Sequence, residues 1–457
     1  MLAQACVQFC DDPTVTDHLP GVGFGEALRA WAYVGLNSFG GPAGQIAVMH
    51  REIVDRRKWL DESRFLHALN YAMLLPGPEA QELATYIGWL MHGTRGGLAA
   101  GLLFILPGAL VLLALSIVYA LYQQTAFVQA IFYGVKPAVV ALIAVAVVRL
   151  SRRAIHNRLQ LAVAVGAFVA IFFFDVPFPL IVVAAALVGF AGHRLGRSEP
   201  ARAEATQEAR PSPPRARRSI AVLLVGLVIW LLPVALTVVV TGPQSVFSQL
   251  ALFFAFAAVI TFGGAYALLA YIAQQAVDVY GWLSPDQMLD GLGMAETTPG
   301  PLIMVVQFVA FMAAFGQPSG LDPIVAGVLA SVLVTWVTFA PSFVWIFTGA
   351  PYVESLRNRS TLSAALSGVT AAVVGVIANL GVWFAMQTLF ATSGELRIGP
   401  LRLHTVELAS IDLVALGLTA FALVALLRLK WSLFLTLGVS AALGAAWFLV
   451  VGYLAAG

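Results

Sequence analysis

The stretch Phe39-Gly40-Gly41-Pro42 returns 223 residues later as Phe262-Gly263-Gly264-Ala265 (262 − 39 = 223). Two further blocks return at the same offset: Trp59-Leu60 as Trp282-Leu283, and Pro76-Gly77-Pro78 as Pro299-Gly300-Pro301. Later matches, of Pro107 with Pro341 and of Gly134-Val135 with Gly368-Val369, lie 234 residues apart, so an insertion of 11 residues (234 − 223) separates the two registers. Matching Gly/Pro breaks in two halves of a polytopic chain are the sequence pattern of a transporter binding site.

The composition is that of an integral membrane protein. The 457 residues are 60% hydrophobic and 11% charged, with a mean hydropathy of +0.88, whereas a soluble domain carries about 25% charged residues. The net charge of +2 indicates no particular partner, and we expect no nucleic acid. Cys6 and Cys10 form no C-x-x-C pair, so we expect neither a disulfide framework nor a metal site, and no cofactor. Residues 1–23 lack a basic region followed by an apolar one, so we expect no cleaved signal peptide.

Apolar segments near the roughly 20 residues of a spanning helix follow one another along the whole chain. They are 24–49, 66–92, 97–122, 127–149, 159–174, 177–193, 220–241, 249–273, 287–315, 321–348, 361–388, 410–428 and 431–453. The short pairs 159–174/177–193 and 410–428/431–453 are each two thin spans or one helical hairpin that does not cross. We therefore predict an all-α polytopic membrane protein with roughly ten to thirteen crossings.

The predicted organisation is a first repeat at 1–193, a linker at 194–219 and a second repeat at 220–457. The linker is rich in Arg, Pro, Ala and Glu, so it cannot bury enough apolar surface to fold and reads as disordered. Its arginine excess places it in the cytoplasm by the positive-inside rule. Seven segments lead from the first Phe-Gly-Gly block to the second, and an odd number of crossings makes the two halves inverted-topology repeats. The basic loop 50–64 and the acidic loop 274–286 disagree with that placement.

The two Gly/Pro blocks of each half should break their helices, because proline removes a backbone donor and glycine leaves helical geometry cheaply. The predicted breaks are at Pro42, Pro76, Pro78, Pro299 and Pro301. In a membrane, broken backbone persists only inside protein or beside an aqueous cavity. A helix that restarts after a break directs its N-terminal amides at that place, which suits an anion. The alternative is that the blocks are packing kinks, but their repetition in register in both halves favours a site.

These residues resemble the chromate ion transporter family. The blocks that carry the resemblance are Phe39-Gly40-Gly41-Pro42, Trp59-Leu60, Pro76-Gly77-Pro78-Glu79 with Gln81, and Glu296-Thr297-Thr298-Pro299-Gly300-Pro301-Leu302. Both halves match, as in the long, two-domain form. The resemblance implies a secondary transporter that exports chromate from the bacterial cytoplasm across the inner membrane and protects the cell. It also implies dependence on the proton motive force, with sulfate as a competitor. Ala265 replaces Pro42 in the second copy, so the halves are not equivalent there.

Chromate is a tetrahedral oxyanion without proton donors, so its site needs N–H and O–H groups and positive potential. The candidate substrate-binding residues beside the breaks are Asn37, Ser38, Gly40, Gly41, Gln45, Gly77, Gln81, Thr297, Thr298 and Gly300. Each polar side chain among them is individually more typical of a helix–helix hydrogen bond. Lys136 lies within an apolar segment, where a lysine is costly and therefore a functional candidate. It either provides the fixed positive charge of the anion path or is neutralised by a nearby Glu.

Carboxyls beside the breaks are candidates for proton coupling, because burial favours their neutral form. Glu79 and Glu296 are the residues we expect in that role, whereas Glu82 is better explained as a capping or loop carboxylate. The small residues Gly97, Gly101, Gly108 and Ala109 are predicted to be helix-packing positions.

The chain is not expected to be an enzyme. It has no G-x-x-x-x-G-K-[ST] and no H-E-x-x-H, and its seven histidines are scattered. The alternatives to chromate export are transport of sulfate or another tetrahedral oxyanion, and a passive channel. The sequence leaves open the oligomeric state, a homodimer included, and the half that holds the main site.

Overall fold

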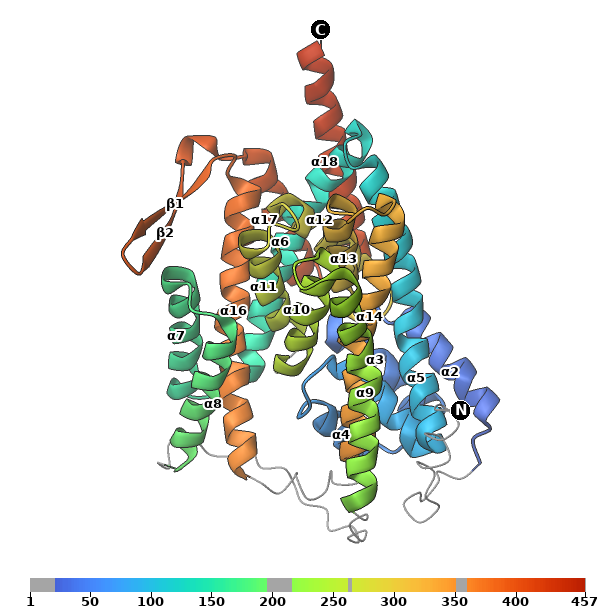
Figure 1. The fold of residues 1–457 in the computed structure, drawn as a ribbon. Coiled ribbons are helices and arrows are strands. Elements are labelled where there is room, and N and C mark those ends of the chain that lie inside the picture. The colour runs from blue at the N-terminus through green and yellow to red at the C-terminus, as the bar shows by residue number, and fades with distance from the viewer. Residues whose placement is uncertain (1–20, 195–215, 262–264, 351–359, 457) are drawn as a thin grey trace. The chain divides into compact units, whose positions relative to one another are not determined.

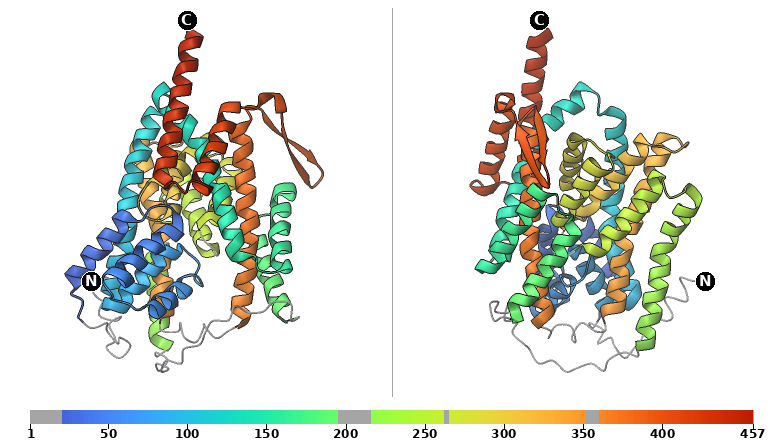
Figure 2. Two further views of the ribbon diagram at one scale, coloured as in Figure 1. Left: turned by 180° about the vertical axis from the view of Figure 1, so that it is seen from behind. Right: turned by 60° about the vertical axis from the view of Figure 1, so that its left-hand side comes forward.

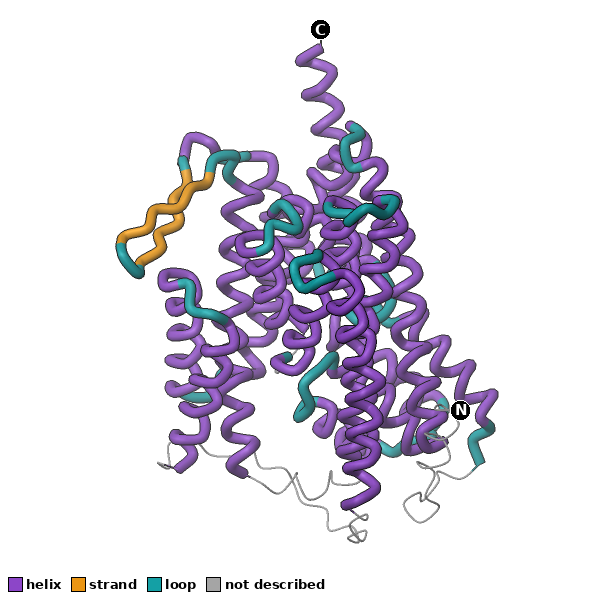
Figure 3. The backbone as a smooth tube through the Cα atoms, in the orientation of Figure 1, coloured by secondary structure: helices purple, strands orange, loops and turns teal. Residues whose placement is uncertain are grey.

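The computed structural model describes residues 21–194, 216–261, 265–350 and 360–456 (Figure 1). Cys6, Cys10, most of the predicted linker and Phe262-Gly263-Gly264 lie outside these ranges. The described chain is helical almost throughout, with strands confined to one hairpin, as Figure 3 shows. The prediction of an all-α polytopic membrane protein is therefore confirmed.

The first half forms helices interrupted at the predicted breaks. They are α2 Phe24–Asn37, α3 Gly41–His50, the π-turn η1 Arg51–Arg56, α4 Glu62–Ala72, α5 Glu79–Tyr122, α6 Ala126–Ala154, α7 Arg158–Phe174 and α8 Phe178–Arg194. Helix α5 contains two segments that we predicted as separate spans. Its backbone leaves helical geometry at His92 and Gly93. Gly88 lies against Gly96 and Ala100, so the chain folds back at this point and the predicted boundary is confirmed.

The second half repeats this pattern. It contains α9 Ala216–Thr241, α10 Val246–Ile260, α11 Ala265–Gln274, the π-turn η2 Gln275–Val279, α12 Pro285–Thr297, the short η3 Leu302–Met304, α13 Val305–Gly316, α14 Pro323–Gly349, α16 Ser360–Leu389, η5 Leu408–Ser410, α17 Leu413–Leu427 and α18 Leu433–Ala456. The antiparallel strands β1 Ser393–Ile398 and β2 Leu401–Val406 were not predicted. Helix α9 begins at Ala216, so the last residues of the predicted linker are helical.

Six helices of the described chain are long and apolar enough to cross a membrane. They are Glu79–Tyr122, Ala126–Ala154, Ser219–Thr241, Pro323–Gly349, Ala364–Leu389 and Leu433–Val450. Five further apolar helices are only 10–17 residues long, shorter than the roughly 20 residues that a span requires. Two of these short helices, Val246–Ile260 and Leu302–Gly316, result from the breaks, because the breaks divide the predicted spans 249–273 and 287–315 into shorter helices. The number of crossings therefore stays a prediction.

Contacts divide the chain into two compact units that do not follow the two repeats. Unit 1 comprises Met1–Ala114, Ala201–Leu268 and Thr298–Ser360, and unit 2 comprises Leu115–Pro200, Leu269–Thr297 and Thr361–Gly457. Each unit thus takes segments from both halves of the sequence. The predicted break residues Pro42, Pro76, Pro78, Pro299 and Pro301 all belong to unit 1, so this unit holds breaks from both repeats.

In unit 1, α14 packs against α9, α10 and α13. Close packing depends on small residues, as expected of helices in a membrane. A Cβ atom on Gly97 would come within 2.7 Å of the Phe347 ring, and one on Gly101 within 2.5 Å of the Phe343 ring. The predicted packing role of these glycines is confirmed.

In unit 2, α6 packs against α12, α17 and α18, and α18 is the red C-terminal helix of Figure 2. Gly134 of α6 lies directly on the backbone of α18 at Ser440 and Gly444. Helix α16 meets α7 and α8 in the same way, at Gly375 and at Gly368. Unit 2 is therefore a bundle of close helix crossings around α6 and α16.

Candidate functional site

The breaks of the two repeats bind each other through the backbone. The Gly300 N–H donates to the Ser38 carbonyl at 2.8 Å, and the Gly77 N–H donates to the Thr261 carbonyl at 3.0 Å. Ser38 and Thr261 are equivalent at the 223-residue offset, and so are Gly77 and Gly300. Each repeat therefore donates one hydrogen bond from its Pro-Gly-Pro block to the first break of the other repeat. We call this reciprocal pair of bonds, Gly300–Ser38 and Gly77–Thr261, the crossing.

The acceptors of these bonds have the same local structure. Helix α2 ends at Ser38 with φ −86° and ψ 88°, and α10 ends at Thr261 with φ −75° and ψ 87°. Each hydroxyl donates to a carbonyl one helical turn earlier, from Ser38 to Val34 and from Thr261 to Ala257, both at 2.6 Å. This backbone is exposed by the break and then paired by the other repeat, so its polar groups are not left unpaired in an apolar environment.

The donors are glycines because of their backbone conformation. Gly300 has φ +89° and Gly77 has φ +157°, angles that residues with a side chain rarely adopt. Gly40, which precedes α3, has φ +82°, which also lies in the range that favours glycine. The backbone of the crossing therefore requires glycine at these positions.

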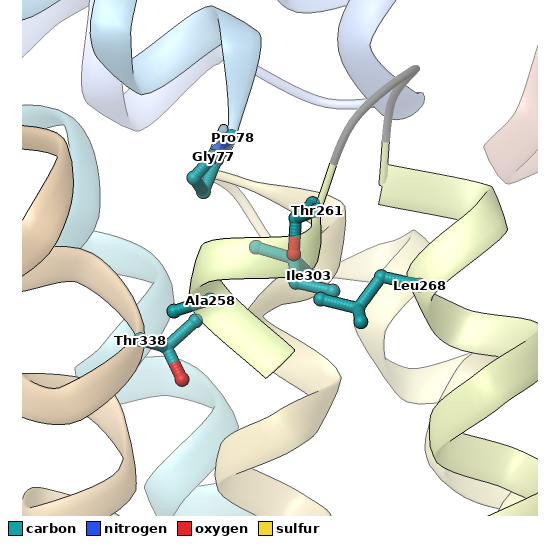
Figure 4. Close-up of a pocket in the computed structure, with 7 residues that line it drawn as sticks. All are labelled: Gly77, Pro78, Ala258, Thr261, Leu268, Ile303 and Thr338. Carbon is teal, nitrogen blue, oxygen red and sulfur yellow. The ribbon is translucent and has the colours of Figure 1, made fainter. Parts of the chain in front are cut away.

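One side-chain hydrogen bond is present on only one side of the crossing. The buried Gln45 amide donates through Nε2 to the Gly300 carbonyl at 2.7 Å. Its counterpart at the 223-residue offset is Leu268, which has no donor to offer. Leu268 instead lines a small cavity beside Gly77 and Pro78 (Figure 4).

That cavity has a volume of about 10 Å³, with Ala258, Thr261, Ile303 and Thr338 as its other lining residues. This is about the room that one water molecule needs, so a tetrahedral oxyanion does not fit in this conformation. The two hydroxyl oxygens that Figure 4 shows belong to Thr261 and Thr338. This cavity therefore has room for a water molecule but not for the anion.

The Gly77 side of the crossing is polar and incompletely hydrogen-bonded. Glu82 is fully buried, and neither of its carboxyl oxygens has a hydrogen-bond partner among the described residues. The Ser342 hydroxyl lies beside this carboxyl and also has none. A Cβ atom on Gly77 would come within 2.7 Å of the Ser342 Oγ atom, so all three residues adjoin. Glu82 thus lies in the first turn of α5 and accepts no capping bond from the part of the chain that the structure describes, in contrast to the capping or loop carboxylate that we expected.

Most of the predicted donor side chains already have protein partners. Asn37 donates to the Tyr33 carbonyl, Thr297 to the Met294 carbonyl, and Gln45 and Ser38 as described above. The Gln81 amide differs, since it is fully buried and neither its Nε2 nor its Oε1 atom has a partner in the described chain. Gln81 is therefore the predicted donor that can bind a ligand without giving up another bond.

The remaining predicted residues lie around the helix ends. Glu79 begins α5, Gly41 and Pro42 begin α3, and Glu296 is buried at the end of α12. Thr298 is buried next to the Pro299-Gly300-Pro301 block. Within unit 1, the structure brings Ser38, Gln45 and Gly300 together directly through hydrogen bonds, whereas Gly77 is bonded to Thr261.

Lys136 lies in unit 2 and is paired with carboxylates. Its Nζ atom is 2.5 Å from Asp286 and 3.9 Å from Asp290, both on α12. Of the two predicted roles, a neutralised lysine agrees with this geometry, although the partners are Asp rather than Glu. Sequence reasoning missed Asp290, Ser342 and Thr338. An Asp inside the predicted span 287–315 was itself a signal, because intramembrane carboxyls are rare.

Comparison with known proteins identifies the same repeated pattern. The family model described as Chromate transporter matches residues 25–190 and 248–445. A chromate transport protein of Pseudomonas aeruginosa is 32% identical over 391 residues, covering 82% of this chain and 85% of that protein. A probable chromate transport protein of Synechococcus elongatus is 29% identical over 374 residues, covering 81% and 86%. No solved structure matches this chain.

Proposed function

Because this chain belongs to the chromate transporter family, we propose that it is a secondary active transporter that exports chromate across the cytoplasmic membrane of a bacterium. Export lowers the chromate concentration in the cell and so confers resistance. The proton motive force supplies the energy. The cargo is an anion, and the interior-negative membrane potential already favours its exit.

The observation that carries this proposal is the reciprocal crossing of the breaks in unit 1. Broken helices from two repeats that meet around a shared place are the usual architecture of a secondary-transporter site. The reciprocal bonds Gly300–Ser38 and Gly77–Thr261 support an approximate two-fold relation between the repeats. A two-fold axis in the membrane plane gives inverted repeats, in agreement with the odd number of segments between the two blocks. Alternating access then exposes the crossing to one side at a time.

The donors near Gly77 suit an oxyanion once the crossing opens. Gln81 offers an amide without a present partner, and α5 begins at Glu79 with its first-turn N–H groups directed toward the break. Four other predicted donors can bind the anion only if they give up the carbonyl groups to which they now donate. They are Asn37, Ser38, Gln45 and Thr297. Chromate has no proton to donate, so a site built from donors selects it over cations.

Coupling to protons requires a carboxyl that binds and releases a proton during the cycle. Glu79 and Glu296 are proposed for this role because they flank the two Pro-Gly-Pro blocks. An inward flow of protons powers an outward flow of chromate only if the two are bound on alternate steps of the cycle. The carboxyl is therefore protonated while the anion site is empty, and it releases its proton to the cytoplasm before chromate binds.

The test is uptake of labelled chromate by everted membrane vesicles, with wild-type protein and with Glu79→Gln. We expect energy-dependent accumulation that excess sulfate reduces and that an uncoupler abolishes. Flux that only equilibrates the gradient would identify a passive channel. Absence of any chromate flux from well-inserted protein, together with sulfate uptake, would replace chromate by another tetrahedral oxyanion as the cargo.

A further inference from the structure

A second group of ionisable side chains lies in unit 2, apart from the crossing of the breaks. Asp286 and Asp290 project from α12, Lys136 from α6 and Tyr119 from the end of α5. Lys136 Nζ is 2.5 Å from Asp286 Oδ1, and the Tyr119 hydroxyl donates to Asp290 Oδ2 at 2.7 Å. These four side chains form what we call the lysine cluster.

Asp290 is the buried and incompletely bonded member of the lysine cluster. Its side chain is 8% exposed, whereas that of Asp286 is 69% exposed. Its Oδ1 atom has no hydrogen-bond partner among the described residues and lies 3.9 Å from Lys136 Nζ, which is too far for a hydrogen bond. One oxygen of a buried carboxyl is therefore free to hold a proton, or to receive the lysine if the carboxyl is charged.

A second tyrosine–aspartate pair in the same unit shows what a purely structural carboxyl looks like. The Tyr133 hydroxyl donates to Asp412 Oδ2 at 2.7 Å, the same distance as in the Tyr119–Asp290 pair. The other oxygen of Asp412 accepts the N–H groups of Val414 and Ala415, both at 2.9 Å, and so caps α17. Asp412 thus has both oxygens bonded, whereas Asp290 has one bonded and one open.

The charges of the lysine cluster do not balance when both carboxyls are ionised. Lys136 then faces Asp286 and Asp290, which leaves one uncompensated negative charge beside a buried group. A buried charge is stable only when it is paired and hydrogen-bonded. Either a proton on Asp290 or a move of Lys136 from Asp286 toward Asp290 satisfies this requirement. The cluster therefore has two arrangements, which differ by one proton.

The position of the cluster connects it to the transport site. Asp290 lies on α12, which ends at Thr297 and continues in the chain directly into Pro299-Gly300-Pro301. Helix α12 packs on α6, where a Cβ atom on Gly293 would come within 2.7 Å of Val135. A change in the α12–α6 ion pairs therefore acts on the helix that holds one end of the second break.

We propose that Asp290 binds the proton that drives transport, and that Lys136 passes from Asp286 to Asp290 when that proton leaves. In the unloaded state, which returns inward, a proton taken from the external water neutralises Asp290 and Lys136 stays with Asp286. In the loaded state, that proton has left to the cytoplasm and the Asp290 carboxylate holds Lys136, so one proton enters for each anion that leaves. This inference rests on the proposed function and adds Asp290 to the carboxyls named there.

The test uses purified full-length protein in liposomes and two measurements of labelled chromate. Exchange at equal pH on both sides reports binding and movement of the anion, and accumulation under an imposed pH gradient reports coupling. For Asp290→Asn, we expect accumulation to fall by about tenfold, a typical size for coupling between two sites, while exchange falls much less. Its accumulation should also lose the pH dependence of the wild type.

Asp412→Asn is the matched control, because it changes the same chemical group in a tyrosine–aspartate pair without a lysine. We expect it to lower the midpoint temperature of unfolding and to leave the ratio of accumulation to exchange unchanged. An equal loss of that ratio in both variants would overturn the role of Asp290. So would accumulation by Asp290→Asn at the wild-type level.

Failure of the proposed function gives a different result. Wild-type liposomes would then show neither exchange nor accumulation, and both proposals would fall. If Asp290→Asn does not fold, Asp290→Glu keeps the carboxyl but displaces it relative to Lys136 and Tyr119. We expect accumulation to persist with a shifted pH profile, and an unchanged profile would overturn the inference.

Discussion

The two Pro-Gly-Pro blocks have the same backbone bonds but different surroundings. Gly77 adjoins the buried polar side chains of Glu82 and Ser342, whereas Gly300 adjoins the backbone of Phe104 and Gly108. By the two offsets, Val305 stands where Glu82 would be, and Gly108 stands where Ser342 would be. Duplication has thus kept the crossing and changed its side chains. One side is closely packed, and the other retains buried polar groups, for which we predict a role in transport.

Gly108→Ser places the residue of the polar side on the packed side, and we expect it to cause the largest loss of stability. A Cβ atom on Gly108 would run into the Pro299 carbonyl, which is backbone and cannot turn away. Gly108→Ser should therefore destabilise the protein by about 3 kcal/mol, the upper end for overpacking. The measurement is the yield of monodisperse protein and its midpoint temperature of unfolding in detergent.

Ser342→Gly is the control, because it copies Gly108 onto the polar side. It removes a hydroxyl that has no hydrogen-bond partner among the described residues, so we expect a small change in stability. If Gly108→Ser is as stable as Ser342→Gly, the close approach at Pro299 does not exist in the folded protein.

Replacing Glu82 by the residue of the second repeat tests the polar side. Glu82→Val removes a buried carboxyl without hydrogen-bond partners, a group that costs about 1–3 kcal/mol when it is left unsatisfied. We expect the unfolding temperature to rise and chromate transport to fall, since polar groups retained at this cost are typical of functional sites. Thermal unfolding and vesicle uptake should be measured on the same preparation.

Glu82→Gln separates charge from hydrogen bonding at the same position. It keeps a polar side chain of the same size, so transport should be retained if Glu82 acts as a neutral donor. A variant Glu82→Val that is both less stable and fully active would show that the carboxyl is structural.

Removing the hydrogen bond between the Gln45 amide and the Gly300 carbonyl should have a smaller effect on stability. Gln45→Leu copies Leu268, its counterpart, and leaves the buried Gly300 carbonyl without this donor. We expect a loss of about 1 kcal/mol, the low end for an unsatisfied group, because a carbonyl tolerates the loss of one partner better than an N–H does. The midpoint temperature of unfolding reports the change.

The reverse substitution, Leu268→Gln, sharpens this comparison. Leu268 lies beside Gly77 at the small cavity, where an added amide can reach the symmetric position (Figure 4). We expect little change or a slight gain in stability. A loss larger than that of Gln45→Leu would show that the two sides of the crossing are less alike than their backbone bonds indicate.

The sequence predicted the repeated parts of the molecule well, because they depend on local backbone chemistry. The 223-residue offset matched Ser38 with Thr261 and Gly77 with Gly300, and the helices break at those places. Even the π-turns that end α3 and α11 correspond, with φ −93° at Arg57 and φ −91° at Tyr280. Glycine and proline act on their own segment, so their effect can be predicted without knowing the fold.

Partners distant in the sequence could not be predicted in this way. Glu82 adjoins Ser342, and Lys136 pairs with Asp286, because of how the helices pack and not because of any spacing along the chain. The hairpin β1–β2 is a different case. Leu396, Ile398, Leu401 and Leu403 alternate around the turn Gly399-Pro400, a period-2 signal that was present but short.

The smallest expected effect concerns His50, in the first repeat only, since its counterpart is Ala273. The hydrogen bond to Glu62, at 2.6 Å, raises the pKa of His50 above 6.5 against the opposing effect of burial, and Asp55 adds to the increase. A raised pKa means that the folded state binds the proton more tightly than the unfolded state does. This stabilisation is complete below pH 6.5 and is lost as the pH rises through the folded-state pKa. Both carboxylates are exposed, so the gain is only a few tenths of a kcal/mol.

The difference in unfolding temperature between wild type and His50→Ala should therefore disappear at alkaline pH. When both proteins also carry Glu62→Gln, this difference should be small at every pH. A difference that grows with pH would mean that neutral His50, and not its ion pair, stabilises this end of α3.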